Sequence, residues 1–125
     1  MKKHLLSLCA VALLAAGCVS ASRLDADPRI VVDASVKSAI EVLTVDYGET
    51  HGGNSVVTLA VRNTGGSVRR IQYRTVWFRE DGNPVESIVS IWKNCTLDPG
   101  EIADLRSVSP RADARDFRVE VRRAP

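Results

Sequence analysis

Apolar and polar residues alternate along most of this chain with the two-residue period of a β-strand. Clusters of glycine, proline, asparagine and aspartate interrupt the alternation at short intervals, and no long stretch follows the period of a helix. The strand-like runs occupy residues 29–36, 39–47, 56–63, 68–80, 85–97, 102–110 and 116–123. Seven short strands joined by turns predict an all-β fold, a single immunoglobulin-like antiparallel β-sandwich.

Three of the turn clusters contain the residue types that are typical of a chain reversal. The segment "GETHGGNS" at residues 48–55 is rich in glycine and is typical of a hairpin tip. The segment "DGNP" at residues 81–84 contains Asp-Gly, a strong signal for a short hairpin. In "DPGE" at residues 98–101, proline stands second and glycine third, which is the pattern of a type II turn.

The alternation also assigns side chains to faces, because neighbouring residues of a strand point in opposite directions. In residues 39–47 we expect one face to be shared by Ile40, Val42, Thr44 and Asp46. In the last run we expect inward positions at Phe117, Val119 and Val121, and outward positions at Arg118, Glu120 and Arg122.

Trp77 and Phe78 are adjacent, so they must point to opposite faces of their strand. Trp77 belongs to the same face as Ile71, which predicts that Trp77 lies in the core. Phe78 shares the other face with Gln72 and Arg74. Two interpretations of Phe78 remain open: an isolated exposed hydrophobic side chain, or part of an interaction patch with Gln72 and Arg74.

The beginning of the chain has the features of a bacterial lipoprotein signal peptide. Lys2 and Lys3 precede an apolar run, shorter than the about 20 residues of a spanning helix, and small residues lead to Cys18. The stretch "LLAAGC" resembles a lipobox, in which the cysteine is acylated and becomes the new amino terminus, although Ala15 stands where leucine is usual. The alternative is an ordinary secretory signal with an unmodified Cys18.

We therefore divide the chain into a lipoprotein signal peptide at residues 1–17, a lipidated tether at residues 18–29 and a β-sandwich domain at residues 30–125. Val19 follows Cys18, where an aspartate would resemble an inner-membrane retention signal. This favours anchoring by acyl chains on Cys18 in the inner leaflet of the outer membrane, with the domain facing the periplasm.

Removal of residues 1–17 would leave a mature protein without net charge. The whole chain carries 17 Lys and Arg against 15 Asp and Glu, and Lys2 and Lys3 leave with the signal peptide. A neutral chain gives no support for nucleic-acid binding, which favours a clustered basic surface.

Few residues offer catalytic or metal-binding chemistry. The mature chain has one histidine, His51, and no G-x-S-x-G motif, so we expect neither an enzyme nor a cofactor. A metal site of His51 with Asp46 and Glu49 stays open, but a solvated loop histidine is favoured. For Cys95, a reactive thiol beside Lys93 is the alternative to the favoured interpretation, a small apolar residue packed in or near the core.

The runs "YRTVWFREDGNPVES", "IWKNCTLDPGE" and "DFRVEV", following a lipobox, resemble the YcfL-like family of bacterial envelope lipoproteins. The matching landmarks are Tyr73, Arg74, Trp77, Phe78 and Gly82. Arg79 departs from the family pattern, which typically has aspartate there. The resemblance extends over residues 31–122 and implies a small β-sandwich on a lipid anchor, with no catalytic residues to transfer.

These features together predict a non-catalytic, lipid-anchored interaction module of the cell envelope. Its partner is expected to be an envelope protein or a cell-wall component, bound through a sheet face or an edge strand. The candidate interaction patch consists of Gln72, Arg74 and Phe78. The alternative is a small-ligand or metal carrier that uses the loop around His51.

Overall fold

Seven β-strands make up the fold in a computed structural model that describes residues 27–85 and 90–125. The strands are β1 (Ile30–Val32), β2 (Ile40–Glu49), β3 (Ser55–Asn63), β4 (Arg69–Arg79), β5 (Lys93–Leu97), β6 (Ile102–Val108) and β7 (Ala114–Arg123). Within the described residues there is no helix with the length and apolar character that crossing a membrane requires. The expected signal peptide and Cys18 lie outside the described residues.

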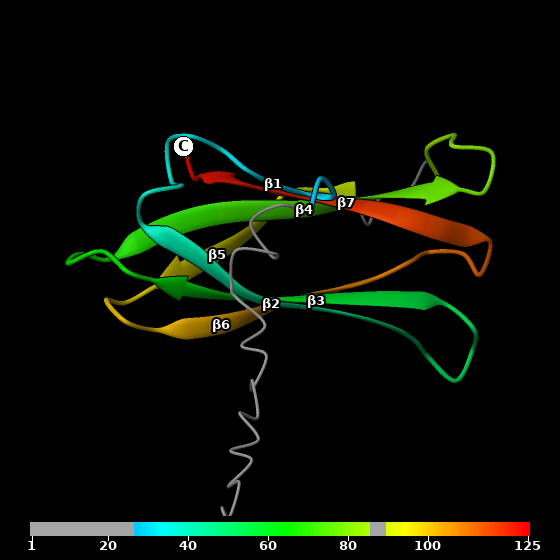
Figure 1. The fold of residues 1–125 in the computed structure, drawn as a ribbon, viewed down its shortest axis with the longest axis horizontal. Coiled ribbons are helices and arrows are strands. Elements are labelled where there is room, and N and C mark those ends of the chain that lie inside the picture. Colours follow the sequence, from blue (N-terminus) through cyan, green and yellow to red (C-terminus); the bar gives the residue numbers. More distant parts are fainter. Residues whose placement is uncertain (1–26, 86–89) are drawn as a thin grey trace, which may run out of the picture.

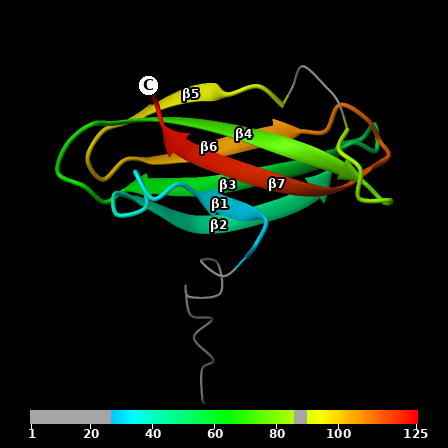
Figure 2. The same cartoon turned by 90° about the horizontal axis from the view of Figure 1, so that it is seen from above.

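The strands form two sheets that face each other (Figure 1). One sheet has four strands in the order β1-β7-β4-β5, and the other has three in the order β2-β3-β6. Seen from above, β7 lies between β1 and β4 (Figure 2). This arrangement confirms the predicted all-β sandwich, and immunoglobulin-type domains have the same division into four and three strands. One pairing departs from the antiparallel expectation, because β1 runs parallel to β7 with Ile30 opposite Val119.

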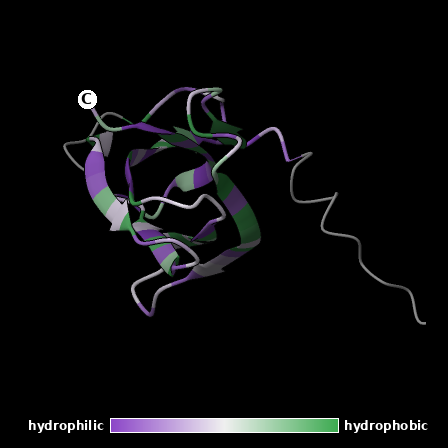
Figure 3. Cartoon of the chain, turned by 90° about the vertical axis from the view of Figure 1, so that its left-hand side faces the viewer, coloured by the Kyte–Doolittle hydropathy of each residue, from purple (hydrophilic) through white to green (hydrophobic). Residues whose placement is uncertain are grey.

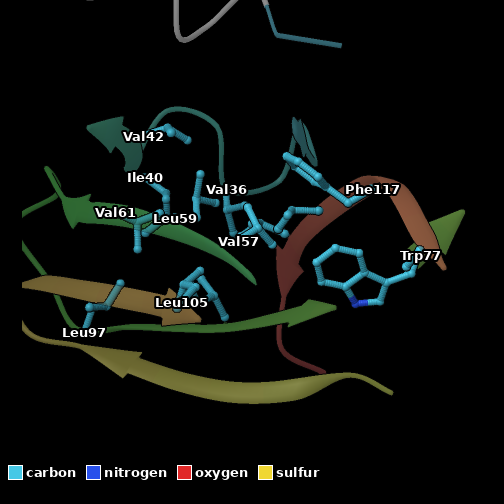
Figure 4. Packing of buried hydrophobic residues seen from close by; sticks show 14 of the residues in the cluster. Val36, Ile40, Val42, Val57, Leu59, Val61, Trp77, Leu97, Leu105 and Phe117 are labelled. Atoms are coloured by element: carbon cyan, nitrogen blue, oxygen red, sulfur yellow. The ribbon is translucent and has the colours of Figure 1, made fainter. Parts of the chain in front are cut away.

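The core lies between the sheets and is filled by the inward side chains of both (Figure 4). Burial alternates strictly along β3, where Leu59 is fully buried, and hydrophilic and hydrophobic bands alternate along the strands in Figure 3. Trp77 of β4 and Phe117 of β7 are the largest fully buried side chains, each 1% exposed. The prediction that Trp77 is the core member of the Trp77–Phe78 pair is confirmed, and Phe78 is half-buried on the opposite face.

A β-bulge in β2 corrects the face expected for residues 39–47. The pairing with β3 shifts register between Val42 and Thr44. Ile40 and Val42 are buried as expected, but beyond the bulge Val45 lies opposite Leu59 and packs against the core. The expectation that Thr44 and Asp46 share the face of Ile40 was therefore wrong, because an extra residue in one strand exchanges the two faces beyond it.

Buried polar side chains in the core are hydrogen-bonded. The Oγ1 of Thr75 on β4 donates to the Oγ of Ser107 on β6 at 2.6 Å, which links the two sheets through the core. At one end of the sandwich, Nδ2 of Asn63 donates to the carbonyl oxygen of Leu97 at 3.0 Å. Since a buried polar group without a partner is destabilising, these bonds help to fix how the sheets face each other.

Glycines at two of the predicted turns adopt the left-handed backbone that disfavours other residues. The φ angles are 82° at Gly82 and 77° at Gly100. The amide of Glu101 donates to the carbonyl oxygen of Asp98 at 3.0 Å, which closes the turn around Gly100.

The run at residues 85–97 is not one continuous strand, because β5 begins only at Lys93. Directly before this run, Pro84 forms a single isolated bridge to Phe78. Proline has no N–H to donate, so it cannot extend the bridge into a ladder.

Candidate functional site

The outward side of the four-stranded sheet carries a cluster of arginine and aromatic side chains, which we call the arginine face. Its members are Gln72, Arg74 and Phe78 of β4, Trp92 just before β5, and Arg118, Glu120 and Arg122 of β7. The antiparallel pairing of β4 with β7 sets Gln72 opposite Arg122 and Arg74 opposite Glu120. Side chains directly opposite each other in such a pair are close enough to interact.

Glu120 is a carboxylate that two arginines share. The Nε of Arg74 donates to Oε2 of Glu120 at 2.7 Å, and the Nε of Arg118 donates to Oε1 at 2.9 Å. The Glu120 side chain is 18% exposed, whereas those of Arg74 and Arg118 are 35% and 44% exposed. Because the arginines are partly solvated, each ion pair contributes at most about 1 kcal/mol to stability. One negative charge facing two positive charges leaves this part of the face cationic.

The guanidinium groups of these arginines lie over aromatic rings. The Cζ of Arg122 lies 3.7 Å from the ring centroid of Trp92, and the Cζ of Arg74 lies 4.5 Å from the same centroid. The Cζ of Arg118 lies 5.6 Å from the ring centroid of Phe78. A guanidinium at such distances is attracted by the ring, and the contact limits the rotamers it can adopt. Phe78 therefore has a neighbour on the face and is not an isolated hydrophobic side chain.

Arg122 is also held by a chain of amide hydrogen bonds across three strands. The Nε and Nη2 of Arg122 donate to Oε1 of Gln72 at 3.1 and 2.9 Å. The Nε2 of Gln72 donates to Oδ1 of Asn94 on β5 at 2.9 Å. Asn94 thus orients the Gln72 amide so that its oxygen faces Arg122. Among the described residues, Arg122 forms no salt bridge.

Gln72, Arg74 and Phe78, the interaction patch predicted from the sequence, all lie on this face. Most of their neighbours could not be identified from the sequence. Arg118, Glu120 and Arg122 were expected to point outward, yet nothing local indicated that their strand pairs with β4. Trp92 lies in an apolar run and carries no signal that would place it against two arginines. The missing information in each case was the pairing of strands that are distant in sequence.

His51 and Cys95 provide no comparable cluster. His51 is exposed at the tip of the β2–β3 hairpin, and no group of three His, Cys, Asp or Glu side chains suited to a metal ion occurs in the parts of the chain that the structure describes. Cys95 is half-buried opposite Ile71 and packs against the core. Burial raises the pKa of the Cys95 thiol, and the charge of Glu101 raises it further. These surroundings favour the packed thiol over the reactive one.

The point where the chain enters β1 is fixed by Arg29. Its Nε and Nη2 donate to the two carboxylate oxygens of Asp27 at 3.1 and 2.9 Å, and its Cζ lies 4.5 Å from the ring centroid of Phe117. Hydrogen bonds from the Arg29 side chain hold the pKa of Asp27 below its usual value. The last residues of the expected tether are thus attached to the domain.

Two grooves lie away from the arginine face. The first, of about 580 Å³, separates the edge strands β1 and β2. It is lined by Ile30, Val31, Val32, Lys37, Ile40, Glu41, Val42 and Thr64, so its walls are mostly apolar. The second, of about 300 Å³, lies along β2 and includes Asp46 and Glu49 but not His51.

Comparison with known proteins identifies the fold and the family. No curated protein matches the chain. The crystal structure of Campylobacter jejuni cj0090 is similar, with a TM-score of 0.67, 18% identity, and coverage of 78% of this chain and 100% of that chain. The crystal structure of a DUF1425 family member from Shewanella sp. pv-4 is similar with a TM-score of 0.62 and 23% identity, covering 69% of this chain and 79% of the other. Residues 28–123 match the family described as protein of unknown function (DUF1425), and the chain therefore belongs to that family.

Proposed function

We propose that this protein is a non-catalytic, lipid-anchored protein of the cell envelope that binds another envelope component through the arginine face. The observation that carries the proposal is the cluster itself, in which Arg74, Arg118 and Arg122 are held on the outward side of the four-stranded sheet by Trp92 and Glu120. Arginine and aromatic side chains are enriched in protein interfaces and supply much of their binding energy.

The proposal of a lipid anchor rests on the lipobox-like sequence ending at Cys18 and on the resemblance to YcfL-like lipoproteins. We propose that acyl chains on Cys18 hold the protein in the inner leaflet of the outer membrane, with the domain in the periplasm. Few residues separate Cys18 from the Asp27–Arg29 attachment at the start of the domain. A short tether keeps the domain close to the membrane and limits the partners to those within reach.

Site-specific photocrosslinking in cells tests the proposed face. Val76 lies on the outward side of β4 opposite Arg118, so p-benzoylphenylalanine at this position would sample the arginine face. The matched control is the same residue at Thr58, which points outward on β3 of the other sheet. We expect a discrete adduct from position 76 and none of the same mass from position 58. No adduct at position 76, or the same adduct at both, would overturn the proposal.

The groove between β1 and β2 favours a second candidate function, the binding of a small apolar ligand. Its volume of about 580 Å³ falls in the range of ligand pockets, and its walls are mostly apolar. Substitution of Lys37, an exposed residue of its lining, by tryptophan would narrow the groove without changing a core residue. A ligand that copurifies with the wild-type protein and is absent from Lys37→Trp would favour this carrier function, provided that Lys37→Trp still gives the position 76 adduct.

A further inference from the structure

We infer that the arginine face receives an acidic segment of a protein partner, and that a carboxylate of this segment binds the edge of the Arg122 guanidinium formed by Nη1 and Nη2. This inference rests on the proposed function, since it names the chemistry of the partner at the same face. Three properties of the face support it: the imbalance of charge, the fixed position of Arg122, and the shape of the surface around it.

The charges on the face are unbalanced in one direction. Glu120 pairs with both Arg74 and Arg118, through one carboxylate oxygen each. Arg122 lies on the same strand as Glu120 but is paired with an uncharged amide, that of Gln72. Asp116, the other carboxylate on this side of β7, lies 4.0 Å from Nη1 of Arg29. Among the described residues Arg122 therefore has no carboxylate partner, and complementary charge both attracts and orients a binding partner.

The position and orientation of the Arg122 guanidinium suit the binding of a carboxylate. The guanidinium has two edges that can donate a pair of parallel hydrogen bonds, and Gln72 takes the edge formed by Nε and Nη2. The adjacent edge, formed by Nη1 and the second proton of Nη2, forms none of the hydrogen bonds found among the described residues. Trp92, at 3.7 Å from Cζ, holds the plane of the group. An incoming carboxylate can thus make a bidentate contact with little loss of side-chain entropy.

The surroundings favour a protein segment over a sugar. The ring of Trp92 is contacted by both Arg74 and Arg122, so it is engaged by cations where a saccharide would stack. Neither of the two grooves described above includes a residue of the arginine face. A broad sheet surface with fixed arginines suits an acidic protein surface, whereas a saccharide or other small ligand usually occupies a concave site.

Fluorescence anisotropy with defined probes tests the inference on the purified, lipidated protein in non-ionic detergent. The probe is fluorescein-labelled octaglutamate, and octaglutamine is the uncharged control. The variant is Arg122→Gln, and its matched control is Arg106→Gln, which removes an exposed arginine from the outward side of β6 in the other sheet. A second variant, Arg122→Lys, keeps the charge but loses the planar edge. Near-ultraviolet circular dichroism verifies that each variant is folded.

We expect octaglutamate but not octaglutamine to bind, and Arg122→Gln to weaken this binding by about fivefold, the upper range for an exposed ion pair. Arg106→Gln should leave it unchanged, and Arg122→Lys should restore less than half of the loss. Equal weakening by Arg122→Gln and Arg106→Gln would overturn the inference, because binding would then follow total charge. Absence of octaglutamate binding would also overturn it.

Sedimentation with purified peptidoglycan separates failure of the inference from failure of the proposed function. If peptidoglycan, but not octaglutamate, retains the protein in a manner that depends on Arg122, the partner is the cell wall and the inference is wrong, while the proposed binding face stands. If neither probe binds but position 76 still gives a discrete adduct in cells, the acidic-segment inference alone fails. If neither probe binds and position 76 gives no adduct, the proposed function is wrong as well.

Discussion

Trp77 and Phe117 pack against each other from neighbouring strands, with ring centroids 6.0 Å apart and ring planes tilted by 59°. Their Cα atoms are directly paired in the β4–β7 ladder, and both rings point into the core (Figure 4). The ring of Tyr47 also stacks on that of Phe117, with ring centroids 5.5 Å apart. Because Tyr47 reaches this position only beyond the bulge in β2, the aromatic cluster joins the two sheets at one end of the sandwich.

Truncation of Trp77 should therefore be severely destabilising. We expect Trp77→Ala to lower the free energy of unfolding by about 3 to 5 kcal/mol, because it removes a fully buried indole and leaves a cavity beside Phe117. Phe78→Ala, on the opposite side of the same strand, should lower it by less than about 1 kcal/mol. Urea denaturation of both variants checks this. Reversed effects would mean that the strand is one residue out of register.

Neutralising Glu120 should have opposite effects on stability and on binding. Glu120→Gln removes the carboxylate shared by Arg74 and Arg118, and the loss of stability should stay under about 2 kcal/mol, at most about 1 kcal/mol for each of the two partly exposed pairs. The same change frees two arginines for an incoming anion, so the affinity for octaglutamate should increase. An unchanged or lower affinity in the anisotropy assay would show that these arginines do not contribute to the binding face.

The Asp27–Arg29 pair should make stability dependent on acid pH. Since hydrogen bonds from Arg29 hold the pKa of Asp27 below its unfolded value, its stabilisation is complete above about pH 4 and is lost as the pH falls through the folded pKa. Asp27→Asn should therefore melt at a lower temperature than the wild type near neutral pH. The two melting temperatures should converge as the pH falls below the folded pKa of Asp27, where this carboxyl is protonated in both states. A difference that persists unchanged below that pKa would contradict this assignment.

The Cys95 thiol should react slowly in the folded protein. Burial and Glu101 raise its pKa, so the thiolate is scarce and the sulfur is shielded. We expect iodoacetamide at about pH 8 to modify Cys95 much more slowly in the native protein than in urea, with the modified peptide quantified by mass spectrometry. Native-state modification as rapid as that of the unfolded chain would restore the reactive-thiol interpretation.

Replacement of Cys18 should abolish membrane anchoring. If the proposed lipobox is correct, Cys18→Ala cannot be acylated and should yield an uncleaved precursor or a soluble periplasmic species. Membrane fractionation and immunoblotting distinguish these forms from the wild type. A mature-length Cys18→Ala band that still fractionates with the outer membrane would contradict the anchor, and would leave the binding face to be judged by crosslinking alone.

Much of the fold follows from local patterns in the sequence. The alternation over residues 68–80 was sufficient to place Trp77 inside and Phe78 outside, because a strand exposes successive residues on opposite sides wherever it pairs. The type II turn at residues 98–101 also followed from local chemistry, since Gly100 adopts a φ of 77° that glycine accepts without strain. Such features depend on a few consecutive residues and need no knowledge of the partner strand.

The arginine face was decided only by tertiary structure. Arg122 meets Gln72 and Trp92 because β7 pairs with β4, and those residues are separated by a large part of the chain. The bulge that turns Val45 inward is likewise invisible in the alternation of β2. Which strands pair, and in which register, depends on how all the inward faces fill one core together. The sequence therefore determined which side chains point outward, and the packing of the two sheets determined which of them meet.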